Sequence, residues 1–243
     1  MALPKLTTPT YELVLPSTGE KIKFRPFLVK EQKLLMMAEE SRDEKQISEM
    51  IQQLIGSCTF GKVDAIVSPI FDVEYVFLQL RMRSVGANIE VNVTCPDDNI
   101  TEVPVKINLE EVNVLNDEKH TNIVSVTDTI KMVMKYPTIN SFDPTIDATK
   151  LKTEQLFDII ADTVYEIYEG ETVHKGSDYT KEEMKKFIES LTSDHFAKIQ
   201  QFFNTMPRLQ HELEVENPIT KVKSKVVLSG LQSFFVSPSH TTT

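Results

Sequence analysis

One pattern occurs twice in this chain, a helix followed by a strand–turn–strand hairpin. In the first copy an expected helix over 70–85 precedes two strands that flank the turn Cys95-Pro96-Asp97-Asp98-Asn99; in the second, a helix over 193–206 precedes strands that flank Asn217-Pro218. Turns of this shape carry C-x-x-C in zinc ribbons, where the thiolates hold the metal. Here the first turn keeps one cysteine and the second has none. We therefore interpret both hairpins as a metal-free, zinc-ribbon-like scaffold used for binding.

Composition restricts the class of protein. The 243 residues are 40% apolar and 26% charged, as in an ordinary globular chain. The net charge of −10 is spread along the chain and would repel a phosphate backbone, so we expect no nucleic-acid partner. No apolar run approaches the roughly 20 residues that cross a bilayer, and no secretory signal is visible, so we expect no membrane partner. Two cysteines, Cys58 and Cys95, fit a reducing compartment.

The N-terminal half is expected to open with a β-hairpin, because apolar and polar residues alternate in 11–15 and 21–24. Leu34, Leu35 and Met37 are expected to face inward from the first helix after it. Ser41 and Glu44 have the spacing of a capping box, and Gly56 is expected to end the second helix. The three expected helices cover 29–40, 42–55 and 70–85.

The rest of the chain is expected to be mainly helical after a second strand pair over 122–128 and 129–135. A proline-containing loop over 136–147 is the expected boundary between a unit of residues 1–135 and a unit of residues 136–243. A helix is predicted over 153–168, a surface loop over 169–179, a capped helix from Thr180, and a short apolar element over 231–236. In the helix over 193–206, the side chains expected to face inward are Phe196, Ile199, Gln200 and Phe203. The predicted fold class is α+β: helical clusters, each followed by a ribbon-like hairpin, plus the N-terminal hairpin.

No catalytic, cofactor or metal site is predicted. The chain has no Walker A sequence, no G-x-G-x-x-G, no G-x-S-x-G and no H-E-x-x-H. Cys95 with Asp97 and Asp98 is a poor zinc set, because carboxylates alone would have to complete it. Asp162, Glu166 and Glu169 have i, i+4, i+7 spacing and are interpreted as one solvated helix face. We expect Cys95→Ser and metal chelation to leave folding almost unchanged.

Five segments of the chain resemble the T-even-type myophage baseplate hub subunit and hub assembly protein family. They are 25–35 (RPFLVKEQKLL), 80–86, 134–137, 202–209 and 230–235. The resemblance implies a non-enzymatic structural or assembly role in a contractile phage tail, with hub or tape-measure proteins as partners. It also implies synthesis in the host bacterial cytoplasm and, for a structural subunit, a place in the virion baseplate. Many relatives carry C-x-x-C in both hairpin turns, and this chain departs from them there.

Without metal, each hairpin should be held by the helix before it, through Leu80 and Val85 in one copy and Phe202 and Met206 in the other. An exposed edge strand would then add a strand to a partner. The predicted partner-binding residues are Ile89, Val91, Leu231, Phe234 and Phe235, although the two phenylalanines also fit a core role. Three functions stay open: a hub subunit or hub assembly factor, a transient chaperone of the tape-measure protein, and an enzyme without a recognisable motif. The oligomeric state is also open.

Overall fold

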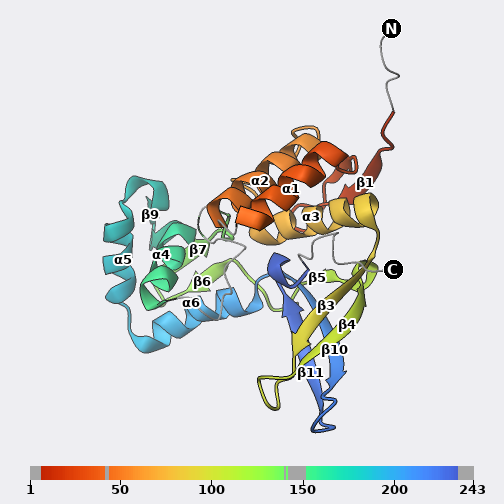
Figure 1. Ribbon diagram of the computed structural model, residues 1–243. Helices are drawn as coiled ribbons and strands as arrows, with labels where there is room; N and C mark the ends of the chain where they lie inside the picture. Colours follow the sequence, from red (N-terminus) through yellow and green to blue (C-terminus); the bar gives the residue numbers. More distant parts are fainter. Residues whose placement is uncertain (1–6, 42–43, 140, 142–151, 235–243) are drawn as a thin grey trace.

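The computed structural model describes residues 7–41, 44–139, 141 and 152–234. It contains three helices next to a small hairpin, a four-stranded sheet with three further helices, and two longer hairpins that project away from the helices (Figure 1). The sheets are all antiparallel. The predicted α+β class is therefore confirmed.

The N-terminal part is built as the alternation predicts. Strands β1 (Tyr11–Val14) and β2 (Lys21–Phe24) pair, and the helices α1 (Val29–Ser41), α2 (Glu44–Cys58) and α3 (Ile70–Val85) follow. Their shared core includes Leu13, Phe24, Ile51, Leu54, Val73, Phe77 and Leu80.

Two expectations for these helices are wrong. Met37 is 54% exposed, because it lies two positions, or about 200° of helix rotation, beyond the buried Leu35. The second helix does not end at Gly56 but continues to Cys58, whose buried side chain extends the apolar stripe of Ile51 and Ile55. The capping box at Ser41 involves a segment, 42–43, that lies outside the described residues.

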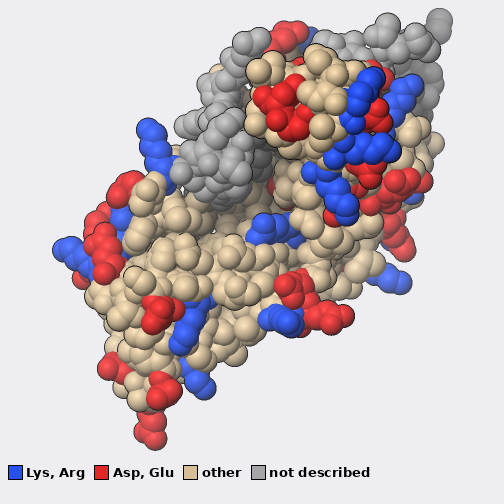
Figure 2. Space-filling view, turned by 90° about the horizontal axis from the view of Figure 1, so that it is seen from below, with Lys and Arg blue, Asp and Glu red and all other residues tan. Residues whose placement is uncertain are grey.

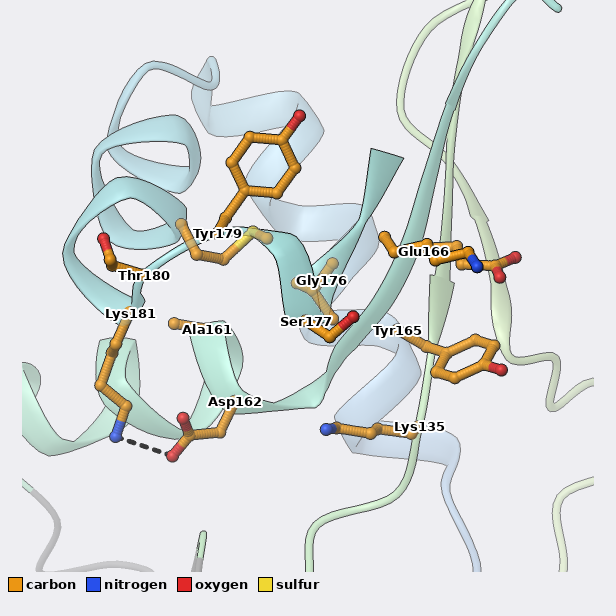
Figure 3. A pocket seen from close by; sticks show the side chains of 13 residues that line it. Lys135, Ala161, Asp162, Tyr165, Glu166, Gly176, Ser177, Tyr179, Thr180 and Lys181 are labelled. Atoms are coloured by element: carbon orange, nitrogen blue, oxygen red, sulfur yellow. Dashed lines mark ion pairs between the residues drawn. The ribbon is translucent and has the colours of Figure 1, made fainter. Parts of the chain in front are cut away.

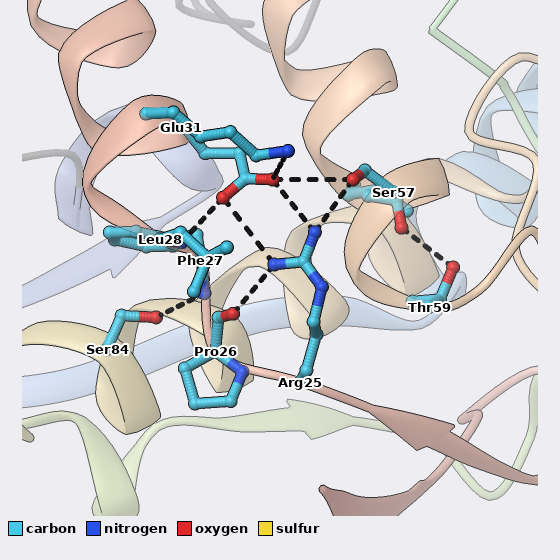
Figure 4. Close-up of polar contacts among 10 residues, drawn as sticks. Arg25, Pro26, Phe27, Leu28, Glu31, Ser57, Thr59 and Ser84 are labelled. Atoms are coloured by element: carbon cyan, nitrogen blue, oxygen red, sulfur yellow. Dashed lines mark hydrogen bonds and ion pairs between the residues drawn. The ribbon is translucent and has the colours of Figure 1, made fainter. Parts of the chain in front are cut away.

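The segment that carries the family resemblance at 25–35 forms a polar clamp (Figure 4). The Arg25 guanidinium donates to Glu31 Oε1 at 2.8 Å and to Ser57 Oγ at 2.9 Å, so the end of β2 is fixed to both α1 and α2. Glu31 also accepts from the Leu28 amide at 2.6 Å, and the Phe27 amide donates to Ser84 Oγ on α3 at 2.9 Å. Burial alone would raise the pKa of Glu31, but the hydrogen bonds from Arg25 and Leu28 outweigh it and the pKa is lowered.

A four-stranded sheet in the order β6-β7-β8-β9 organises the next part of the molecule. Its core side chains, which include Val124, Met132 and Ile167, pack with apolar residues of the three later helices. The strands are β6 (Ile123–Ser125), β7 (Ile130–Met134), β8 (Val164–Glu169) and β9 (Thr172–Lys175), and the helices are α4 (Thr153–Thr163), α5 (Lys181–Glu189) and α6 (Ser193–Thr205).

The helix expected over 153–168 is wrong in its second half. It ends at Thr163, and Val164–Glu169 is a strand paired on both sides, with β7 and β9. Four of the six residues in VYEIYE are β-branched or aromatic, which suits a strand that has partners. The expected loop over 169–179 accordingly contains β9. Glu166 and Glu169 lie on this strand, so the predicted helix face with Asp162 does not exist.

Other elements in this half agree with the sequence. The Thr180–Glu183 capping box is present, with Thr180 Oγ1 accepting from the Glu183 amide and Glu183 accepting from the Thr180 amide. On α6 the prediction for Gln200 is wrong, since that residue is exposed and Phe202 is buried at 2% exposure instead. The expected boundary between residues 135 and 136 stays a prediction; strands β7 and β8, which pair, come from either side of it.

The two longer hairpins pack against each other. The first is β3 (Asn88–Thr94) with β4 (Glu102–Asn108); the second is β10 (Arg208–Glu216) with β11 (Lys223–Ser229), and β5 (Asn113–Leu115) extends it beside β10. Leu78 of α3 joins their common core. Helix α3 thus has two buried sides, one toward the N-terminal helices and one toward the hairpins.

This packing corrects the expected support of the hairpins. Leu80 lies in the core of the N-terminal helices and Phe202 in the core of the four-stranded sheet, while Val85 is 37% exposed. The two hairpins instead share one core, to which α3 contributes Leu78, so each hairpin is supported by the other as well as by a helix. Residues more than 100 positions apart therefore stabilise each other.

Candidate interaction surface on the paired hairpins

The two hairpin turns begin with the same backbone hydrogen bond, although the first has one more residue between its strands than the second. The carbonyl of Cys95 accepts from the Asn99 amide at 2.9 Å, and the carbonyl of Asn217 accepts from the Lys221 amide at 2.9 Å. Asn99 and Lys221 both have left-handed backbone angles, φ 54° and φ 63°. Each turn thus starts with a residue followed by proline and closes four residues later, so Cys95 and Asn217 are equivalent positions.

The two turns also touch each other. The Asn217 side-chain amide donates to both Asp97 carboxylate oxygens at 3.1 Å and to Asp98 Oδ2 at 2.9 Å. Its own carbonyl oxygen accepts from the amides of Ile219 and Thr220. Asn217 is completely buried, and both ends of its amide are satisfied, as burial of a polar group requires.

The two carboxylates at this junction are held in their charged form. The Thr101 hydroxyl, the amides of Ile100 and Thr101, and Asn217 together lower the pKa of Asp98. The Thr220 hydroxyl and Asn217 lower the pKa of Asp97. We call this set of contacts among Asp97, Asp98, Asn217 and Thr220 the turn junction.

Cys95 is positioned beside the junction but is a poor metal ligand. Its residue is 1% exposed and its thiol is free. Burial raises the pKa of the Cys95 thiol, and the charges of Asp97 and Asp98 raise it further. A thiol that stays protonated binds metal weakly. Across the part of the chain that the structure describes, no group of three or more His, Cys, Asp or Glu has an arrangement that could hold a metal ion.

Apolar side chains are displayed at the ends of both hairpins. Ile100 is 82% exposed, Ile219 is 76% exposed and Val222 is 45% exposed. They belong to the two turns, which lie at the far end of the hairpins from the helices (Figure 1). We call these three residues the tip cluster. Exposed apolar side chains mark a contact surface where they form one contiguous patch.

The structure places the predicted partner-binding residues in a different setting. Ile89, Val91 and Phe234 come together in the shared hairpin core, where Ile89 is 2% exposed and Phe234 is 1% exposed. Leu231 begins the short helix η4 (Leu231–Phe234), and Phe235 lies outside the described residues. Binding of a partner through these residues stays a prediction, and in this conformation three of them are core.

Sequence reasoning missed the tip cluster. Its signal is small: one isoleucine follows Asp-Asp-Asn in the first turn, and one follows Asn-Pro in the second. The hairpin edges, which were expected to recruit a strand, carry features that oppose strand addition. Pro104 in β4 cannot donate from its backbone, and Lys223 and Lys225 occupy β11.

A separate pocket of about 470 Å³ lies between β8 and the start of α5 (Figure 3). Lys181 pairs with Asp162 across one side of it at 2.7 Å, and Lys135 and Ser177 line the same space. Gly176 shapes its wall, because a Cβ there would lie 2.3 Å from the Val164 carbonyl oxygen. No histidine or cysteine lines the pocket.

Charged side chains of both signs lie on the face seen from below (Figure 2). On the described part of that face, Lys and Arg side chains are interspersed with Asp and Glu instead of forming one basic area (Figure 2). No helix among the described residues is both long enough and apolar enough to span a bilayer.

An α+β protein whose fixed hairpin tips display apolar side chains has the features of a structural or assembly component. Comparison with protein families agrees: the family model described as T4 bacteriophage base plate protein matches residues 8–236, nearly the whole chain. The chain therefore belongs to the T4 bacteriophage base plate protein family, as the resemblance in the sequence predicted. Comparison with curated proteins and with solved structures gave no match.

Proposed function

We propose that this protein is a baseplate hub subunit or hub assembly factor that acts through protein–protein contacts without catalysis. Family membership supports a structural or assembly role among phage baseplate proteins. The observation that carries the proposal is the pair of hairpins joined at the turn junction, which holds two exposed isoleucines on a common support. A rigid, projecting surface of this kind suits assembly, since little freedom is lost on binding.

We further propose that the hairpins are a metal-free derivative of a zinc ribbon. The shared opening of the two turns supports this, because Cys95 and Asn217 each precede a proline and each accept a backbone hydrogen bond from the residue four positions later. Asn217 supplies hydrogen bonds between the turns, at a place where a ribbon would bridge them through the metal. In this proposal the junction replaces the stabilisation that metal binding gives to a ribbon.

The partners in this proposal are baseplate hub or tape-measure proteins. The protein would be made in the host bacterial cytoplasm and would act at the baseplate of the virion. Contacts with either kind of partner need no cofactor.

Quantitative mass spectrometry of purified virions tests the proposal, together with affinity purification of tagged protein from infected cells. A defined copy number in the virion supports a subunit. Absence from the virion, with hub precursors co-purifying from infected cells, supports an assembly factor, and co-purification of the tape-measure protein alone supports the transient chaperone. A protein found with none of these partners contradicts the proposal.

A further inference from the structure

We propose that the tip cluster is a docking knob that inserts into an apolar socket bordered by Lys and Arg on a neighbouring baseplate protein. This inference rests on the proposed function and specifies its contact surface. The tip cluster comprises Ile100 from the first turn and Ile219 and Val222 from the second.

The two isoleucines of the tip cluster are highly exposed. Ile100 and Ile219 each leave more than three quarters of their surface in water, in turns whose other residues, apart from Cys95 and Val222, are polar or proline. Apolar side chains of this size gain most from burial when the free protein leaves them exposed. Scattered exposed apolar residues are ordinary, but here they come from two segments about 120 residues apart that the fold joins at one place.

The hairpin tips are preorganised for binding. A hairpin tip normally moves, and ordering it on binding reduces affinity. Here the two turns are tied together by the buried Asn217 amide, which reaches Asp97 and Asp98, and by the Thr220 hydroxyl, which reaches Asp97. The Asp98 carboxylate in turn fixes the amides of Ile100 and Thr101 at 3.0 Å. The backbone that bears Ile100 is therefore set before any partner arrives.

The charge around the tip cluster selects the chemistry of the partner. The turns and the strand residues that close them carry four carboxylates against two lysines, Lys221 and Lys223. The four are Asp97, Asp98, Glu102 and Glu216. One of the two lysines, Lys223, already pairs with Glu214 at 3.5 Å. The rim around the knob is thus acidic, and charge complementarity calls for a basic border around the socket.

The test uses the full chain in the assembling phage, with two substitutions in the knob, Ile100→Asp and Ile219→Asp. The matched control is Val29→Asp, because Val29 is 81% exposed on α1 and lies away from the hairpins. We expect the knob variant to lower the yield of baseplates that contain the protein at least about tenfold, and the control to match the wild type. Thermal unfolding of each purified variant verifies that the fold is intact.

A photo-crosslinking residue at position 100 locates the socket directly. We expect crosslinks to one baseplate protein, at residues next to Lys or Arg, and no such crosslinks from position 29. If the aspartate variant unfolds more easily than the wild type, Ile100→Ser with Ile219→Ser replaces it in the same assay.

The outcomes separate this inference from the function on which it rests. If the wild type associates with baseplate proteins and the knob variants associate equally well, the docking-knob proposal is wrong and the proposed function stands. If the wild type itself associates with none, the function fails. Crosslinks from position 100 to a second copy of this chain, with self-association lost in the knob variant, would also overturn the proposed partner.

Discussion

The buried amide of Asn217 donates to the carboxylate of Asp97 across 120 residues of sequence. It joins two hairpins that are far apart in the chain, and it also donates to Asp98 Oδ2 at 2.9 Å. Substitution Asn217→Ala should strand the two carboxylates of the junction and leave a small void. We expect a loss of about 1–3 kcal/mol in the free energy of unfolding, measured by urea denaturation. Asn92→Ala, at an exposed position of β3, is the control; equal losses in both variants would contradict the junction.

The junction should also make stability depend on acid. The pKa of Asp98 and of Asp97 is lowered in the folded protein, so both contribute stability above the unfolded value of about 3.9, and that contribution is lost as pH falls through the lower folded values. Melting temperatures measured from pH 6 to pH 3 should fall less steeply for Asp98→Asn than for the wild type. Glu110→Gln, away from the turns, should keep the wild-type slope. Parallel slopes in all three proteins would refute this account.

Around the polar clamp at the start of α1, removal of two neighbouring cations should lower the unfolding free energy by unequal amounts. Arg25→Ala leaves the buried Glu31 carboxylate without its main partner and should cost about 2–4 kcal/mol of unfolding free energy. Lys30 is a second cation near the same carboxylate, at 3.6 Å, but its own side chain is 71% exposed. Lys30→Ala should therefore cost less than about 0.5 kcal/mol of unfolding free energy. Chemical denaturation compares the two variants directly. Similar losses of unfolding free energy would show that burial does not decide the contribution of these two ion pairs.

Two glycines should respond to alanine with opposite signs. Gly176→Ala places a methyl group 2.3 Å from the Val164 carbonyl oxygen, so the backbone between β8 and α5 must shift, and a loss of about 1–3 kcal/mol is expected. Gly56 lies within α2 with open space around its Cα, and Gly56→Ala should gain about 0.5–1 kcal/mol. Thermal melts of the two single variants decide this, and destabilisation by both would mean that α2 is not packed as described.

Metal removal should leave the hairpins intact. We expect incubation with EDTA to leave the melting temperature unchanged, because the junction holds the turns through hydrogen bonds. Cys95→Ser should cost about 1 kcal/mol, more than the sequence alone predicts, since the structure buries this side chain to 1% exposure. A melting temperature that falls by many degrees on chelation would contradict the metal-free proposal.

Local patterns in the sequence predicted the hairpins, the helix starts and the Thr180–Glu183 cap, because each depends on residues a few positions apart. The strand β8 was missed because Leu156, Ile160 and Val164 continue a helical periodicity, and its partners β7 and β9 are separate segments. Local pattern cannot show that a remote strand will compete for the same residues.

The same reasoning explains the mixed result for the site. An apolar strand face such as that of Ile89 and Val91 looks the same in sequence whether a partner or the chain's own second hairpin covers it. The equivalence of Cys95 and Asn217 could be seen from the proline that follows each. The contact between their turns could not, because it depends on how two distant hairpins pack.

The shared core of the hairpins has a consequence for synthesis on the ribosome. Ile89 and Val91 emerge early, but the residues that cover them, among them Leu209, Val215 and Phe234, are translated more than 100 residues later. Until then the first hairpin exposes an apolar face, which places it at risk of aggregation or proteolysis. A chain interrupted before residue 208 should therefore be degraded, so that only chains carrying both hairpins survive to reach the assembling tail.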